Sequence, residues 1–163
     1  MTIALDKKTT ALDVVDRRIL EALARDCRIS LADLGRRVGL SPPGVSDRLR
    51  KLEDRGVIRG YSVDVDPSAL GLGISAWLRI RPVPGKLHIV AALLAELPEI
   101  VECDRITGED CFIAKAHVAS VIDLERMIDR INPHAMTNTS IIQSSPVPRR
   151  LPAFADFGSR TAI

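Results

Sequence analysis

The chain has 163 residues, of which 46% are hydrophobic, 27% are charged and only 3% are aromatic. This composition indicates a folded protein with an aliphatic core and excludes an intrinsically disordered chain. No uncharged run reaches the ~20 residues of a membrane-spanning helix, and the first residues lack the apolar stretch of a signal peptide. Three cysteines without a CxxC pair argue against a disulfide scaffold and a cysteine-only zinc site. We therefore expect a cytoplasmic protein that does not act at a membrane.

The charge is distributed unevenly along the chain. Residues 1–60 contain 13 Lys and Arg against 9 Asp and Glu, a net charge of +4, and ten of these cations are arginine. Residues 61–163 contain 10 Lys and Arg against 12 Asp and Glu, a net charge of −2. A basic first part and a mildly acidic second part predict two domains with different partners.

Three helical segments are predicted in the basic part. Apolar residues at three- and four-residue spacing give a helix over residues 13–25. A second helix starts after Ser30, which can cap it, and ends at Gly39. A third helix starts at Ser41, a capping serine followed by a proline, and ends at Gly56. These signals predict three short helices in close succession.

The connection between the second and third helices is only about three residues long, Gly39 to Ser41. Helices joined by so short a turn cross steeply, as in a helix-turn-helix, whose later helix enters the major groove of DNA. A three-helix bundle with a solvated arginine surface is the alternative, and the tight turn favours DNA binding. Cations around the third helix would neutralise phosphates, which supplies most of the affinity. The predicted DNA-binding residues are Arg36, Arg37, Ser41, Pro43, Gly44, Ser46, Asp47, Arg48, Arg50, Lys51 and Arg59.

The second half predicts a different domain. Strict alternation over residues 72–81 indicates a strand with Trp77 and Arg79 on the face opposite Leu78. A helical stripe, two strands joined by a turn, a second helix and a final strand follow, over residues 89–97, 100–106, 111–118, 124–131 and 137–143. The order β-α-β-β-α-β is that of the ferredoxin-like fold. The predicted class is therefore α+β.

The predicted domain boundaries follow from these elements. Residues 1–63 form the helix-turn-helix domain, which ends in a short β-ribbon, or wing, over residues 57–63. Residues 64–71 form a linker, residues 72–148 the ferredoxin-like domain, and residues 149–163 a C-terminal tail. A four-stranded sheet with helices on one face leaves its other face uncovered, so a partner sheet could bury Trp77 and Arg79.

The first domain closely resembles the DNA-binding domain of the Lrp/AsnC (leucine-responsive) transcriptional regulators. The matching pieces are LDxxDRxIL from Leu12, D-x-R-I-S from Asp26, VGLSP from Val38 and RxxxLExxGxIxGY from Arg48. Together these motifs are specific, although each alone is weak. The resemblance continues to about residue 148 and so covers nearly the whole chain.

The resemblance implies an amino-acid-sensing second domain, the RAM domain, and a homodimer that assembles to tetramers or octamers. In the family, the effector cleft lies between sensing domains, near the turn after the second strand and beside the last strand. The implied effector-binding residues are Thr107, Gly108, Glu109, Asp110, Thr137 and Thr139. Asp110, or Glu109 in a shifted register, would receive the ammonium of an amino acid. The turn lacks an aromatic residue, which leaves the effector's identity open.

The resemblance implies a sequence-specific, DNA-binding transcriptional regulator that responds to an amino acid or a related small molecule. One alternative is a nucleoid-like architectural protein that binds DNA at many sites. Another is an enzyme similar to the siroheme decarboxylases, but residues 61–66 are acidic and lack the histidine of a haem-like pocket. We expect no enzyme activity. The three histidines are far apart, so we also expect no metal and no cofactor other than an amino-acid effector.

Overall fold

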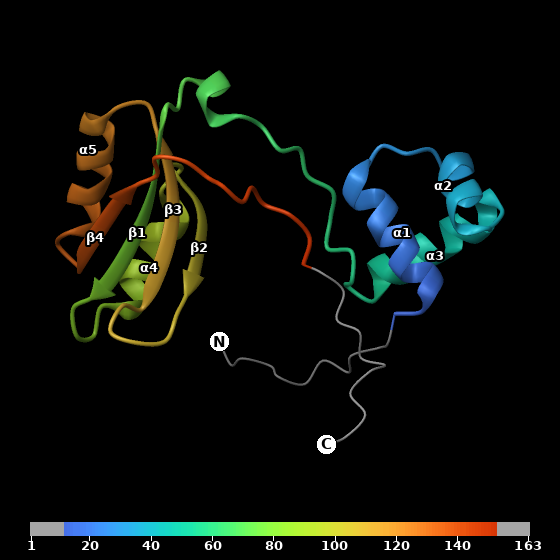
Figure 1. Cartoon of the computed structure of the whole chain (residues 1–163). Helices are drawn as coiled ribbons and strands as arrows, with labels where there is room; N and C mark the ends of the chain where they lie inside the picture. Colours follow the sequence, from blue (N-terminus) through green and yellow to red (C-terminus); the bar gives the residue numbers. More distant parts are fainter. Residues whose placement is uncertain (1–11, 153–163) are drawn as a thin grey trace, which may run out of the picture. The chain divides into compact units, whose positions relative to one another are not determined.

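The computed structural model describes residues 12–152 (Figure 1). These residues divide into two compact units. One consists of residues 12–63 together with 148–152, and the other of residues 64–147. In the described part of the chain, no helix has the length and apolar character needed to cross a bilayer.

The first unit contains three helices, α1 (Val14–Arg25), α2 (Leu31–Val38) and α3 (Pro42–Asp54). Each helix begins at a residue whose side chain accepts a hydrogen bond from the backbone N–H three residues later. These capping residues satisfy amides that would otherwise lack a partner in the first turn. The apolar faces of the three helices meet in one core, formed by Ile19, Ala22, Leu34, Val38, Val45 and Leu52.

The predicted β-ribbon over residues 57–63 does not form, and this prediction was wrong. The backbone N–H groups of Val57 and Ile58 both donate to the Leu52 carbonyl, at 2.9 and 3.1 Å, which closes the end of α3. Further along, the Tyr61 hydroxyl donates to Glu53 Oε1 at 2.9 Å. The segment therefore turns back onto α3 instead of pairing as a strand.

The second unit begins with a short 3₁₀ helix, η1 (Pro67–Leu70), inside the predicted linker. Its sheet consists of β1 (Ile74–Pro82), β2 (Ile100–Arg105), β3 (Phe112–Val118) and β4 (Ala135–Ile141). The strand order is β2-β3-β1-β4, and every pair is antiparallel. Helices α4 (Leu87–Glu96) and α5 (Val121–Ile131) complete the β-α-β-β-α-β order. The predicted fold class is confirmed.

The two faces of the sheet differ in burial. Ala76, Leu78 and Ile80 of β1 are fully buried and belong to one core with apolar residues of α4 and α5. Trp77 alternates with them along the strand and is 36% exposed on the opposite, open face. There Lys115 Nζ lies 5.9 Å from the centroid of the Trp77 ring. The helices cover one face of the sheet and leave the other open within the chain.

Candidate functional site

The turn between α2 and α3 is held by the backbone. Gly39 has φ of +75°, a left-handed conformation that glycine adopts at little cost, and it ends α2. The N–H groups of Gly39 and Leu40 both donate to the Gly35 carbonyl, at 2.9 and 3.0 Å. A Cβ added at Gly35 would lie 2.5 Å from the Leu40 carbonyl oxygen, so the turn packs directly on this glycine. Sequence reasoning missed Gly35, although a glycine inside an amphipathic helix was a signal of close approach.

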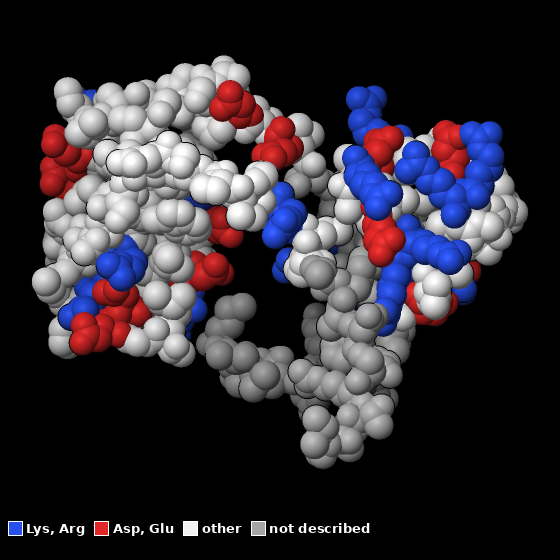
Figure 2. Space-filling model, viewed as in Figure 1, with Lys and Arg blue, Asp and Glu red and all other residues white. Residues whose placement is uncertain are grey.

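The outward side of α3 carries most of the predicted DNA-binding residues. Ser41, Pro43, Ser46, Arg50 and Lys51 are exposed, and Gly44 and Asp47 are partly exposed. Figure 2 shows that arginine and lysine side chains gather on the displayed face of the first unit. This arrangement places small residues at the start of the helix and cations along it.

Two of these cations are paired within α3. Asp47 accepts hydrogen bonds from Arg50 Nη2 at 2.9 Å and lies 2.7 Å from Lys51 Nζ. The hydrogen bond with Lys51, followed by that with Arg50, lowers the pKa of Asp47 below 3.8. Exposed pairs of this kind contribute little to stability, so both cations can exchange the carboxylate for a phosphate.

Arg48 lies elsewhere on α3, on the side that faces α1. Its Nη1 is 2.5 Å from Asp13 Oδ2 and 2.8 Å from Asp16 Oδ1. Its hydrogen bonds with Asp13 and then Asp16 raise the pKa of Arg48, and the bond from Arg48 lowers the pKa of Asp13. We therefore leave Arg48 out of the proposed DNA contacts. Asp13 and Asp16 are the two acids of the LDxxDRxIL motif, but the motif did not reveal their partner.

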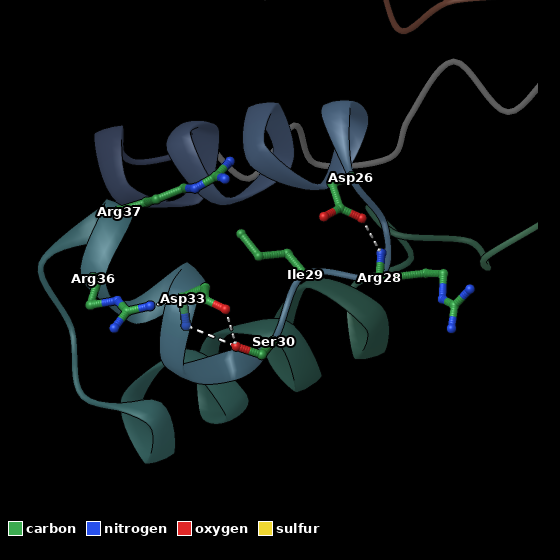
Figure 3. Close-up of a pocket in the computed structure, with 7 residues that line it drawn as sticks. All are labelled: Asp26, Arg28, Ile29, Ser30, Asp33, Arg36 and Arg37. Carbon is green, nitrogen blue, oxygen red and sulfur yellow. Dashed lines mark hydrogen bonds and ion pairs between the residues drawn. The ribbon is translucent and has the colours of Figure 1, made fainter.

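A hollow of about 610 Å³ lies beside the turn between α1 and α2, next to Arg36 and Arg37. Figure 3 shows that the guanidinium groups of Arg28, Arg36 and Arg37 lie apart from one another. Arg36 is paired with Asp33, whose N–H is bonded to Ser30 at the start of α2. The three arginines therefore do not converge on one anion. Arg36, Arg37 and Arg59, which are all exposed, can act as separate phosphate contacts.

The predicted effector turn follows β2. The Ile106 N–H donates to the Cys111 carbonyl at 2.9 Å, and Gly108 has φ of +113°. Arg81 Nη2 lies 2.5 Å from Glu109 Oε2 and 3.6 Å from Asp110 Oδ1. The two acids that would receive an ammonium are thus already in contact with an arginine, which sequence reasoning did not include in the site.

The predicted effector-binding threonines, Thr137 and Thr139, lie on the helix-covered face of the sheet. Thr137 pairs with Ile80 and Thr139 with Leu78, so their side chains share the helix-covered face with those core residues. Thr139 Oγ1 is buried without a hydrogen-bond partner. Arg81 belongs to the open face, so a single chain does not bring the acidic turn and the two threonines together.

The fold and these surfaces define a class of protein: a DNA-binding transcriptional regulator with a separate ligand-binding domain. Residues 12–59 match the family model described as winged helix-turn-helix DNA-binding, and residues 75–152 match the Lrp/AsnC ligand binding domain. The chain belongs to the Lrp/AsnC family of transcriptional regulators. The predicted family is confirmed.

Several relatives support this membership. The transcriptional regulator LrpC of Bacillus subtilis is 36% identical over 82% of this chain and 92% of its own. LrpA of Mycobacterium tuberculosis is 38% identical over 79% of this chain and 87% of its own. Among solved structures, B. subtilis LrpC superposes with a TM-score of 0.81, at 34% identity, over 85% of this chain and 99% of its own. The feast or famine regulatory protein of M. tuberculosis, in complex with L-methionine, also gives 0.81, at 35% identity, over 87% and 99%.

Proposed function

We propose that α3 is the recognition helix of this regulator and that its outward side reads operator DNA. The observation that carries this proposal is the exposed row of small and cationic residues after the tight turn at Gly39. Helix-turn-helix proteins place the start of this helix in the major groove, while cations beside it contact phosphates. The proposed DNA contacts are Arg36, Arg37, Ser41, Pro43, Gly44, Ser46, Asp47, Arg50, Lys51 and Arg59.

In vitro selection from random-sequence DNA tests this proposal. The full chain should enrich a small set of related sequences, and a labelled duplex of that set should bind less tightly as salt rises. Lys51→Ala should weaken binding, and it should lower the slope of log K against log salt by about 0.9, the loss of one phosphate contact. Glu96→Ala, at the end of α4, serves as a control outside the first unit. Enrichment of no sequence, or of many unrelated ones as for an architectural protein, would contradict the proposal.

We further propose that the second unit binds an amino acid and that the effector site is shared between copies of the chain. Support comes from the family of the domain and from the relative solved with L-methionine. Within one chain the acidic turn and Thr139 face different sides of the sheet, so a second copy would complete the site. The proposed residues are Thr107, Gly108, Glu109, Asp110, Thr137 and Thr139.

A thermal-shift screen against the twenty amino acids tests this effector proposal. A ligand that binds only the folded protein stabilises it by RT ln(1 + L/Kd), where L is the free ligand concentration, so the melting temperature rises with the logarithm of L once L exceeds Kd. Asp110→Asn should remove that rise, because it takes away the carboxylate for the ammonium. Asp129→Asn, on the exposed side of α5, is a matched control that should keep it. The absence of a shift with all twenty amino acids would count against an amino-acid effector.

We propose a homodimer formed through the open face of the sheet, with association to tetramers or octamers. The exposed Trp77 and the exposed, apolar Met136, which pairs with Arg81 on the open face, support a protein partner there. A dimer would also present two recognition helices to a two-fold operator. We propose that the chain acts as a regulator in the cytoplasm and not as an enzyme, as its relatives are named transcriptional regulators.

A further inference from the structure

Asp16 is the charged residue that stands out in the described part of the chain, because it is buried, with 6% of its surface exposed. A buried carboxylate is stable only when charged or polar groups compensate for its lost hydration. Here Arg48 Nη1 lies 2.8 Å from Oδ1, and Arg55 Nη1 lies 3.8 Å from Oδ2. Both arginines come from α3 and its C-terminal end, whereas Asp16 belongs to α1.

Asp13, the N-cap residue of α1, also contacts Arg48. Asp13 caps α1 by accepting a hydrogen bond from the Asp16 N–H at 2.7 Å, and its other oxygen lies 2.5 Å from Arg48 Nη1. The first turn of α1 therefore offers two carboxylates to one guanidinium. The side chain of Arg48 is only 32% exposed, whereas that of Arg50, two residues later, is 70% exposed.

The surroundings of Arg48 do not suit a phosphate. A hollow of about 470 Å³ next to it is lined by three acids, Asp13, Asp16 and Asp47, as well as by three cations. A phosphate that approached Arg48 would meet these carboxylates, and their repulsion would offset the attraction of the guanidinium. Arg48 also lies between the buried Val45 and Leu52 along α3, on the side that packs against the rest of the unit.

We infer that Arg48 is a positioning residue, which fixes the recognition helix against the first turn of α1 through Asp13 and Asp16 and does not itself contact DNA. The inference rests on the proposed function of α3 as the recognition helix. Through these contacts, Arg48 sets the direction in which α3 presents its outward side. The ion cluster joins α3 to the start of α1 through residues that are 32 and 35 positions apart in the sequence, so it acts on the arrangement of the whole unit.

The test compares Arg48→Met with Arg50→Met, a substitution of the same kind at an exposed position of the same helix. Both proteins are titrated with the labelled duplex that the wild-type chain selects, over a range of salt concentrations. Arg50→Met should lower the slope of log K against log salt by about 0.9, because a phosphate contact is lost. Arg48→Met should weaken binding by about tenfold, a typical coupling for an ion-pair network, and leave the slope unchanged.

A double-mutant cycle provides the readout that separates positioning from contact. If Arg48 acts through Asp16, the affinity cost of Arg48→Met should largely disappear once Asp16 is replaced by Asn. Circular dichroism confirms that each variant is folded at the temperature of the titration, and Asp13→Asn replaces Asp16→Asn if the latter does not fold.

Three results would overturn the inference: a lower salt slope for Arg48→Met, an unchanged affinity, or additive costs in the cycle. Failure of the proposed function is distinguishable from all three. In that case the wild-type chain selects no sequence, or Arg50→Met leaves both affinity and slope unchanged.

Discussion

Gly35 is the residue on which the helix-turn-helix turn depends most directly. A Cβ at this position would lie 2.5 Å from the Leu40 carbonyl oxygen, a backbone atom that cannot move aside without opening the turn. We predict that Gly35→Ala lowers the free energy of unfolding by about 2 kcal/mol, as overpacking does in a close-packed interior. Urea denaturation followed by circular dichroism measures this loss.

The control for this substitution is Gly73→Ala. Gly73 has no positive φ, and a Cβ built there meets no atom within 4 Å. Its replacement should therefore change stability by less than about 0.5 kcal/mol. Equal denaturation midpoints for Gly35→Ala and Gly73→Ala would show that the turn can relax around an added methyl group.

The pairing of Asp13 with Arg48 predicts a dependence of stability on pH. The hydrogen bond from Arg48 lowers the pKa of Asp13 in the folded chain below its ordinary value of 3.8. The unfolded chain therefore binds the proton more readily, and the stabilisation is present above pH 3.8 and is lost as the pH falls through the folded pKa. Asp13→Asn lacks this contribution at every pH.

The expected loss of stability on acidification is tested by measuring the free energy of unfolding from pH 6 downward, for the wild type and for Asp13→Asn. The difference between the two proteins should be constant above about pH 5 and should shrink as the solution becomes more acidic. Glu21→Gln, an exposed substitution in the same helix, is the control for the exchange of a carboxylate for an amide. A difference that grows on acidification would contradict the role of the Arg48 bond.

At the residue scale, the spacing of residues predicted which side chains of a helix are exposed. It did not predict contacts between residues that are far apart in the sequence. The exposure of Arg50 and Lys51 follows from helical periodicity alone, and the structure agrees. The partners of Arg48 are 32 and 35 residues away, a separation that periodicity cannot connect. The face of Thr139 likewise depends on its register with Leu78, which only the assembled sheet determines.

At the scale of elements, the N-cap of α2 is a local interaction whose loss can be measured. Ser30 Oγ accepts a hydrogen bond from the Asp33 N–H at 3.1 Å and donates one to Asp33 Oδ2 at 2.6 Å. We predict that Ser30→Ala lowers the free energy of unfolding by about 1 kcal/mol, the usual value for a lost helix cap. Thermal denaturation of the full chain measures this change.

Ser46→Ala is the matched control, because Ser46 is exposed in the interior of α3 and alanine favours helices. Its stability should be equal to or slightly above that of the wild type. A stability for Ser30→Ala that equals that of Ser46→Ala would show that the cap contributes nothing to the folded state.

Elements with their own start and stop signals were predicted best. All three helices of the first unit lie within a residue or two of the predicted bounds, because capping residues and glycines mark their ends. The last strand runs over Ala135–Ile141 and not over the predicted 137–143. Strand ends are set by pairing with a neighbour, and Ala135 pairs with Pro82. The absent ribbon over residues 57–63 has the same origin, since β-propensity without a partner strand does not make a strand.

At the scale of the whole molecule, the distribution of charge agrees with the division into two units. The part that carries the proposed recognition helix has a net charge of +4 over residues 1–60, whereas residues 61–163 have −2. A polyanion such as DNA is therefore attracted to the first unit and not to the second. Its open sheet face combines Trp77, the cation over it and the exposed Met136 of β4, which suits a protein partner.

The open face leads to the prediction that Trp77→Glu weakens self-association. A glutamate at this position would be buried by the partner sheet, and its desolvation would oppose dimer formation even with Lys115 beside it. We expect the dimer dissociation constant to rise at least about tenfold, the range for loss of an aromatic anchor at an interface. Sedimentation velocity over a concentration series measures this shift.

Ile89→Glu, at an exposed apolar position of α4, is the control and should leave association unchanged. Weaker association for Ile89→Glu together with unchanged association for Trp77→Glu would show that the helix-covered side, and not the open face, mediates association.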